Sequence, residues 1–204
     1  MRDFQETPRH LSQDYSLFLI RNLGALNSKL LEQLHSTLLK KSAVVSLERL
    51  TKGRLVALTI YGPKLLLQPF QQELNLLELE DYTKKYSSEN LVVFEVIRKN
   101  QPVEGEIFTD LPKLNDDEQF WWQLILQPKT VQRKKIFSGQ IRVGLIISSN
   151  KELSSQFESM NGGNLLKVPR PYSQEAMQEL LRSRTFNFTH AQKFEISEVL
   201  TLLG

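Results

Sequence analysis

Cysteine is absent from the 204 residues of this chain. The chain therefore has no disulfide, no thiolate nucleophile and no cysteine-bound metal, and its composition is compatible with a reducing compartment. Long apolar runs are missing as well. No stretch approaches the ~18 apolar residues of a membrane-spanning helix, so we expect no transmembrane span. The start of the chain carries Asp3 and Glu6 and does not fit a secretory signal peptide.

Neither sign of charge dominates. The chain has 26 basic and 23 acidic residues, a net charge of +3, which is typical of a mixed surface and too small to indicate a dedicated polyanion binder. Hydrophobic residues make up 40% and charged residues 24%, as in folded domains rather than disordered ones. The length allows one large domain or two of about 100 residues each.

Catalytic and nucleotide-binding motifs are missing too. No Gly-rich string ending in Gly-Lys-Ser/Thr is present, which excludes a P-loop ATPase. His10, His35 and His190 are scattered and lack acidic neighbours at metal-ligand spacing, so we expect surface or boundary histidines. The acidic clusters at 78–81 and 116–118 are expected to be solvated, and a small enzyme with an unrecognised carboxylate site is the less favoured alternative. We therefore predict no catalytic residue, no metal site and no cofactor.

The first part of the chain has the pattern of one α+β unit. Apolar residues at three- and four-residue spacing predict a helix over residues 23–40, which Asn22 or Asn27 could cap. The other expected elements are strands at 14–20, 43–50, 54–61 and 76–81 and a helix at 64–74, which Pro69 would kink or delay. This order predicts a ferredoxin-like unit, with two helices on one face of an antiparallel sheet, within residues 1–84.

The remaining residues, 85–204, predict a second α+β unit after a polar linker at 83–90. Its expected elements are a strand at 91–98, a hairpin formed by 120–127 and part of 136–148, and helices at 151–160, 173–184 and 197–203. The predicted fold class is therefore α+β with two ferredoxin-like units.

The hairpin that begins at Phe120 is the most informative stretch. Alternation places Phe120, Trp122, Leu124 and Leu126 on one face, and Trp121 and Ile125 on the other. We expect one tryptophan to anchor a core and the other to lie under a second layer or at an interface, which makes Trp121 and Ile125 candidate interface residues.

The loop of this hairpin contains the basic residues Lys129, Arg133, Lys134 and Lys135. Clustered cations beside strand aromatics are typical of phosphate contacts to nucleic acid, so these four are the candidate nucleic-acid-binding residues. The alternative is that they only keep an exposed hairpin soluble. Signature strings of RNA-binding domains are absent.

Several segments read as one pattern. They are Leu31–Leu39, the hairpin around Gly53, Tyr61–Lys64, Glu78–Tyr82, Phe120–Pro128 and Phe194–Leu203. Together they resemble the N-terminal region ahead of the motor in conjugative, type IV secretion coupling-type ATPases, as found in ultra-small bacteria. The resemblance covers most of residues 29–204. It contains no ATPase motif, so no ATPase residue is expected here.

The resemblance implies a non-enzymatic accessory domain that assists assembly or substrate handover. Its implied partners are an ATPase motor or other secretion-machinery subunits, with DNA and a homo-oligomer as further partners, at a cytoplasmic, membrane-proximal location. The alternative from the residues alone is a free-standing nucleic-acid-binding module with an RNA-binding-like α+β fold.

Overall fold

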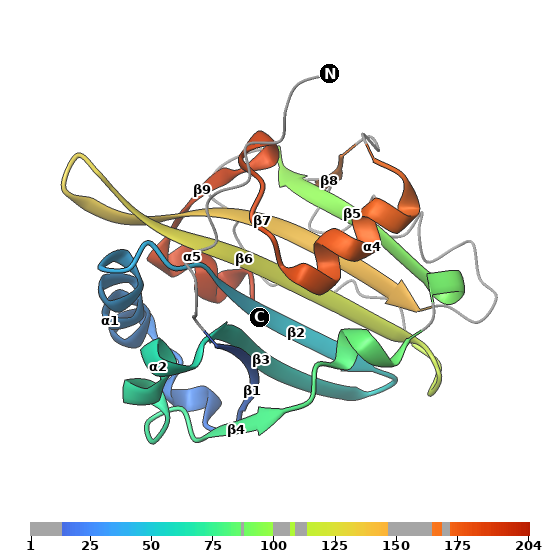
Figure 1. Cartoon of the computed structure of the whole chain (residues 1–204), viewed down its shortest axis with the longest axis horizontal. Coiled ribbons are helices and arrows are strands. Elements are labelled where there is room, and N and C mark those ends of the chain that lie inside the picture. Colours follow the sequence, from blue (N-terminus) through green and yellow to red (C-terminus); the bar gives the residue numbers. More distant parts are fainter. Residues whose placement is uncertain (1–13, 87, 100–106, 109–113, 147–164, 169–171) are drawn as a thin grey trace.

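The computed structural model of the chain describes residues 14–86, 88–99, 107–108, 114–146, 165–168 and 172–204. Within these residues, nine strands form a single sheet in the order β4-β1-β3-β2-β6-β7-β5-β8, with β9 paired to β7 (Figure 1). Every pairing is antiparallel. The predicted α+β class is confirmed in this form, a large antiparallel sheet with few helices.

The first half of the chain forms the β4-β1-β3-β2 end of the sheet. Its elements are β1 (Tyr15–Ile20), η1 (Leu23–Ala25), α1 (Ser28–Leu39), β2 (Val45–Lys52), β3 (Leu55–Pro63), α2 (Lys64–Leu67), η2 (Gln68–Phe70) and β4 (Leu76–Leu79). Helix α1 begins after Asn27, whose side chain accepts a hydrogen bond from the Leu30 amide. The helix expected over 64–74 is instead the short α2 followed by η2, because Pro69 in η2 has no N–H to continue an α-helix.

The second half adds long strands to the same sheet. Its elements are η3 (Tyr82–Lys85), η4 (Ser88–Asn90), β5 (Leu91–Arg98), β6 (Gln119–Val131), β7 (Lys134–Ile146), β8 (Leu165–Lys167), α4 (Gln174–Ser183), η6 (Phe188–His190), β9 (Gln192–Glu195) and α5 (Ile196–Thr201). The helix expected at 151–160 lies outside the described residues. None of the described helices has both the length and the apolar character needed to cross a membrane.

The two halves meet at β2 and β6. These strands pair from Val45 opposite Leu126 to Lys52 opposite Gln119, so one sheet contains strands of both expected units. The expectation of two ferredoxin-like units is not confirmed, and the division at residue 84 stays a prediction. The linker expected at 83–90 overlaps η3 and η4.

The central strands β6 and β7 are buried on both faces of the sheet. On one face, α1 and α5 cover a large core that contains Trp122. On the other face, α4 covers a smaller core in which Met177 and Leu181 pack with Trp121. Both tryptophans are therefore buried, one in each core.

Candidate functional site

Strands β6 and β7 extend beyond the strands beside them. The partner of β6 on one side, β2, ends its pairing at Leu126, and β5 pairs with β7 only from Ile141 onward. Residues 127–138 therefore form a two-stranded hairpin arm, flanked along part of β7 by β9. Figure 1 shows the tip of this arm projecting past the rest of the sheet.

The arm ends in a two-residue turn at Gln132 and Arg133, between the ends of β6 and β7. Their φ angles are 48° and 67°, as in the type I′ turn that matches the twist of a tight hairpin. Such turns favour Asn-Gly. Glycine is preferred because a residue with a Cβ atom destabilises the left-handed conformation by ~1 kcal/mol or more. The tip therefore holds a basic residue in a conformation in which glycine would be more stable.

The register of the arm sorts its cations onto two faces. Lys129 lies opposite Ile136, and Val131 lies opposite Lys134, so Lys129 and Lys134 share one face. Lys193 of β9 lies opposite Ser138 and extends this cationic face, which we define as Lys129, Lys134 and Lys193. Lys135 points to the other face, where its Nζ lies 3.9 Å from a carboxylate oxygen of Glu32 in α1.

The predicted basic residues thus belong to one arm but not to one surface. Arg133 and Lys134 are exposed near the tip, and Lys129 is half-buried. Lys193 was missed by the sequence analysis, because nothing local in residues 192–195 indicates that β9 pairs with β7.

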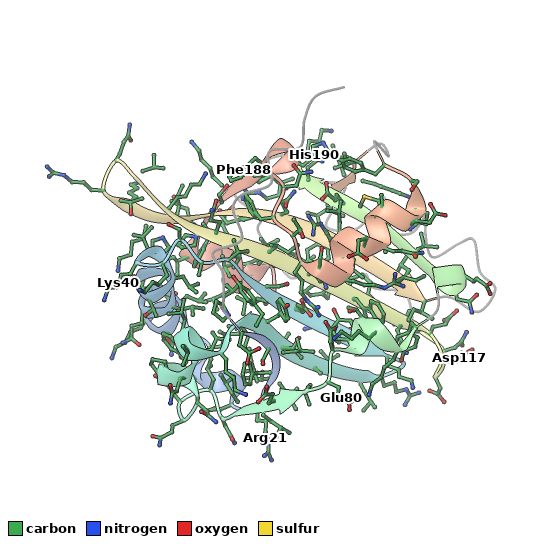
Figure 2. The ribbon with its side chains drawn as sticks, in the orientation of Figure 1. Arg21, Lys40, Glu80, Asp117, Phe188 and His190 are labelled. Carbon is green, nitrogen blue, oxygen red and sulfur yellow. The ribbon has the colours of Figure 1, made fainter. Side chains whose placement is uncertain are left out.

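Phe188 stands beside the cationic face. Its side chain is 52% exposed, and the Nζ of Lys129 lies 5.3 Å from the centre of its ring. Phe186 packs edge-on against the same ring with centroids 5.0 Å apart. Phe188 opens η6, and Figure 2 labels it on this side of the molecule.

His35 is hydrogen-bonded to both strands at the base of the arm. Its Nε2 lies 3.0 Å from the carbonyl oxygen of Lys129 and 2.9 Å from that of Ile136, the two residues of one cross-strand pair. Both partners are acceptors, so Nε2 carries the hydrogen and donates to them. The sequence analysis expected a surface or boundary histidine here. That was wrong, because His35 is fully buried with its ring edge against Phe137.

The candidate interface residues lie inside the protein. Trp121 is 1% exposed and contacts the rings of Tyr82 and Tyr86, and Ile125 is also fully buried. Neither side chain reaches the surface of the described structure. Their role in contacts with another protein stays a prediction.

The sheet face beneath α4 contains a row of polar side chains in register across five strands. Cross-strand pairing connects each member to the next, and all are buried: Thr59 of β3, Glu48 of β2, Gln123 of β6, Arg142 of β7 and Glu95 of β5. We call this set the polar row. Burial of three charged groups requires partners, because an unpaired buried charge costs several kcal/mol, roughly 3–5 by mutation.

Partners for the polar row come from the C-terminal segment. Arg184, just past α4, pairs with Glu48 and with Asp81, and His190 of η6 places its Nδ1 2.7 Å from Glu95. Arg142 donates to Glu95 and to the carbonyl oxygens of Leu180 and Thr185 around the end of α4. These contacts connect the end of α4 and the residues that follow it to the sheet.

Tyr82 completes the hydrogen bonding around Glu48. Its hydroxyl donates to Glu48 at 2.9 Å and accepts from Gln123 at 3.1 Å. Burial, and then the negative charge of Glu48, raise the pKa of Tyr82 well above its usual value, so the phenol stays protonated. The Oγ of Ser46, the Oγ1 of Thr59 and the Oε1 of Gln123 are buried near this point and have no hydrogen-bond partner among the described residues.

The carboxylates of the acidic cluster at 78–81 have separate partners. Glu78 pairs with Lys64, Glu80 with Lys85 and Asp81 with Arg184. In the part of the chain that the structure describes, no three His, Asp or Glu side chains come together as a metal site. Comparison with protein-family models, curated proteins and solved structures finds no match to this chain.

Proposed function

We propose that this chain is a non-enzymatic accessory domain of a conjugative, type IV secretion ATPase, and that its hairpin arm contacts the DNA being handed over. The observation that carries the proposal is the arm itself, with Arg133 and Lys134 exposed at a projecting tip. Exposed cations on a projecting hairpin can approach phosphates without displacing other protein contacts, and each phosphate neutralised releases bound counterions.

The turn at the tip supports a binding role for Arg133. Residues held in sparsely populated backbone regions cluster at binding and switch sites, where the surrounding structure holds them in place. Arg133 is such a residue, with a φ angle of 67°. A hairpin that only needed to be soluble and tight would be more stable with glycine there.

The wider arrangement also supports the resemblance. The first half has the order β4-β1-β3-β2 expected of a ferredoxin-like unit, and we propose that relationship for residues 14–84. In the proposed assembly the partners are the ATPase motor or other secretion-machinery subunits, and homo-oligomers are a further proposed association. The proposed location is cytoplasmic and close to the membrane that carries the machinery.

The proposal is tested by DNA binding across a salt series. Fluorescence anisotropy with a labelled DNA 20-mer would measure the DNA affinity of the native chain and of the double variant Arg133→Glu, Lys134→Glu. We expect weaker binding and a log Kd–log salt slope flatter by about two, since two phosphate contacts are lost.

The matched control is the double variant Lys52→Glu, Arg54→Glu. These exposed cations lie at the β2–β3 turn, and β2 pairs Lys52 with Gln119, at the end of β6 opposite the arm. The control has the same net charge as the test variant. Equal losses of DNA affinity in the two double variants would show that only net charge matters. Unchanged DNA binding in the arm variant would remove the arm from the proposed function.

The free-standing nucleic-acid-binding module is the second candidate, favoured by the same arm. The size of the native protein separates the two. An immunoblot of source cells with an antibody against this domain should show a band well above the mass of this chain if the domain belongs to an ATPase. A band at the mass of the chain alone would place the free-standing module first.

A further inference from the structure

Phe188 is an exposed aromatic ring on an otherwise well-packed protein. Within the described residues, no other phenylalanine, tyrosine or tryptophan is as exposed to solvent. Fully burying such a side chain would stabilise the fold, and the protein forgoes this stabilisation here. A single exposed leucine needs no explanation, but an exposed aromatic ring beside Lys129 of the cationic face has a specific chemical use.

The ring is held in place rather than left loose. Phe186, which is 9% exposed, packs edge-on against it with an interplanar angle of 78°. The Nζ of Lys129 lies 5.3 Å from the ring centre, within reach of a cation–π contact. A ring positioned in this way loses little freedom when a flat ligand stacks on it, which lowers the cost of binding.

The cationic face carries charges suited to phosphates on the side of the arm where this ring contacts Lys129. Register places Lys129, Lys134 and Lys193 on the same side of β6, β7 and β9. Glu195, opposite Ile136, is an acidic residue on that side of the paired segments. Its single negative charge leaves the net charge of this face positive. Cations along strands with an aromatic ring beside them form the combination by which proteins bind unpaired nucleic acid, the cations following the backbone and the ring stacking on a base.

We propose that the cationic face binds single-stranded DNA, with one base stacked on Phe188. This inference rests on the proposed function, because it uses the same arm and names the form of DNA that the arm accepts. In a duplex the faces of the bases are covered by their neighbours, so duplex DNA can meet the lysines but not the ring. The ring therefore gives a preference for unpaired strands that charge alone does not supply.

The test compares a labelled 15-mer of thymidine with a duplex of the same length. Phe188→Ala should weaken single-strand binding about 5- to 150-fold, the range for losing one base–aromatic stack, and should leave duplex binding unchanged. Phe188→Trp should retain the single-strand affinity, because it preserves an aromatic face. Leu55→Ala removes an even more exposed apolar side chain at the start of β3 and serves as the control.

The outcomes separate the two proposals. Unchanged single-strand affinity in Phe188→Ala, together with a loss in the Arg133→Glu, Lys134→Glu variant, overturns the stacking site and leaves the proposed function in place. Unchanged binding in both variants overturns both. An equal loss for single strand and duplex in Phe188→Ala also overturns the inference, since it indicates damage to the arm rather than a lost stack.

Discussion

Arg184 and Glu48 form a buried ion pair between the end of α4 and the middle of β2. The Nε of Arg184 lies 2.7 Å from the Oε1 of Glu48, and the two side chains are 2% and 0% exposed. Arg184 has a φ angle of 49°, a left-handed conformation that ends α4 and turns the chain toward the sheet. The same guanidinium also donates to both oxygens of Asp81. One side chain thus connects three segments that are distant in sequence.

Removing this guanidinium should strongly destabilise the protein. Arg184→Ala leaves Glu48 buried without its cation, and breaking one partner of a buried pair costs about 3–5 kcal/mol. Urea unfolding followed by tryptophan fluorescence measures the loss, since Trp121 lies in the core beneath α4. Lys64→Ala, which breaks the exposed pair with Glu78, is the control and should have little effect. Equal losses in the two variants would contradict a special role for the buried pair.

Asp81 should make stability depend on pH in the acid range. Burial opposes its ionisation, but the hydrogen bonds and charge of Arg184, with the hydrogen bonds from Thr83, outweigh burial and lower the pKa of Asp81. An unfolded aspartate titrates near pH ~3.9. Because the folded pKa lies below this value, the contribution of Asp81 is fully present above about pH 4 and is lost as pH falls through the folded pKa.

The measurement is the free energy of unfolding from pH 7 to pH 2.5 in the native chain and in Asp81→Asn. The native chain should lose more stability than the variant below about pH 4, so the difference between them should shrink there. A difference that stays constant down to pH 2.5 would show that the charge of Asp81 contributes nothing.

The sequence predicts the local elements of this fold well, because their signals are local. Alternation in 120–127 predicts that Trp121 and Trp122 point to opposite faces, and the two side chains do lie in two different cores. Asn27, one of the two caps that the pattern offers for the first helix, caps α1, and Ser173 caps α4 at the start of the helix expected over 173–184. Such signals depend on a few neighbouring residues, which one sequence displays in full.

The polar row could not be predicted, because its members come from five strands. Glu48 follows Leu47 in an alternating strand and looks like a residue on a solvated face. It is buried because β2 pairs with β6 and because Arg184 lies over it, and neither fact has a local signature. His35 was misjudged for the same reason, since the carbonyl oxygens that surround it belong to a hairpin far along the chain. The one local hint is Gln123, a polar residue between Trp121 and Ile125 on a buried face.

His35 should control the order of the hairpin arm. His35→Ala removes the donor shared by the carbonyls of Lys129 and Ile136 and leaves a cavity, a combined loss of about 2–4 kcal/mol. Amide hydrogen exchange of residues 127–138 should become faster in this variant, and His35→Gln, which keeps a donor, should restore part of the protection. Exchange that accelerates equally in β1 and β3 would indicate a global loss of stability rather than a local role at the arm.

Gly139 should not tolerate even a methyl group. A Cβ atom at this position would lie 2.6 Å from the ring of Phe194 and 2.9 Å from Leu126, both fully buried. Because a packed ring cannot move aside easily, Gly139→Ala should lower the free energy of unfolding by about 1–3 kcal/mol. Gly24→Ala is the control, since its nearest contact would be 3.8 Å away. A neutral result for Gly139→Ala would mean that β9 shifts to make room.

Arg133→Gly should change stability and DNA binding in opposite directions. Glycine adopts the left-handed conformation of this turn without strain, so the substitution should raise the free energy of unfolding by about 1 kcal/mol. It also removes a cation at the tip, so DNA affinity should fall and the slope of log Kd against log salt should flatten by about one.

Gln132→Gly is the control. It relieves the same kind of strain at the neighbouring position and keeps every charge, so it should stabilise the chain without weakening binding. Urea unfolding and anisotropy on the same preparations measure both quantities. If Arg133→Gly gained stability with no loss of affinity, the strained arginine would have no binding role, and the proposed function would lose the support that it draws from the turn.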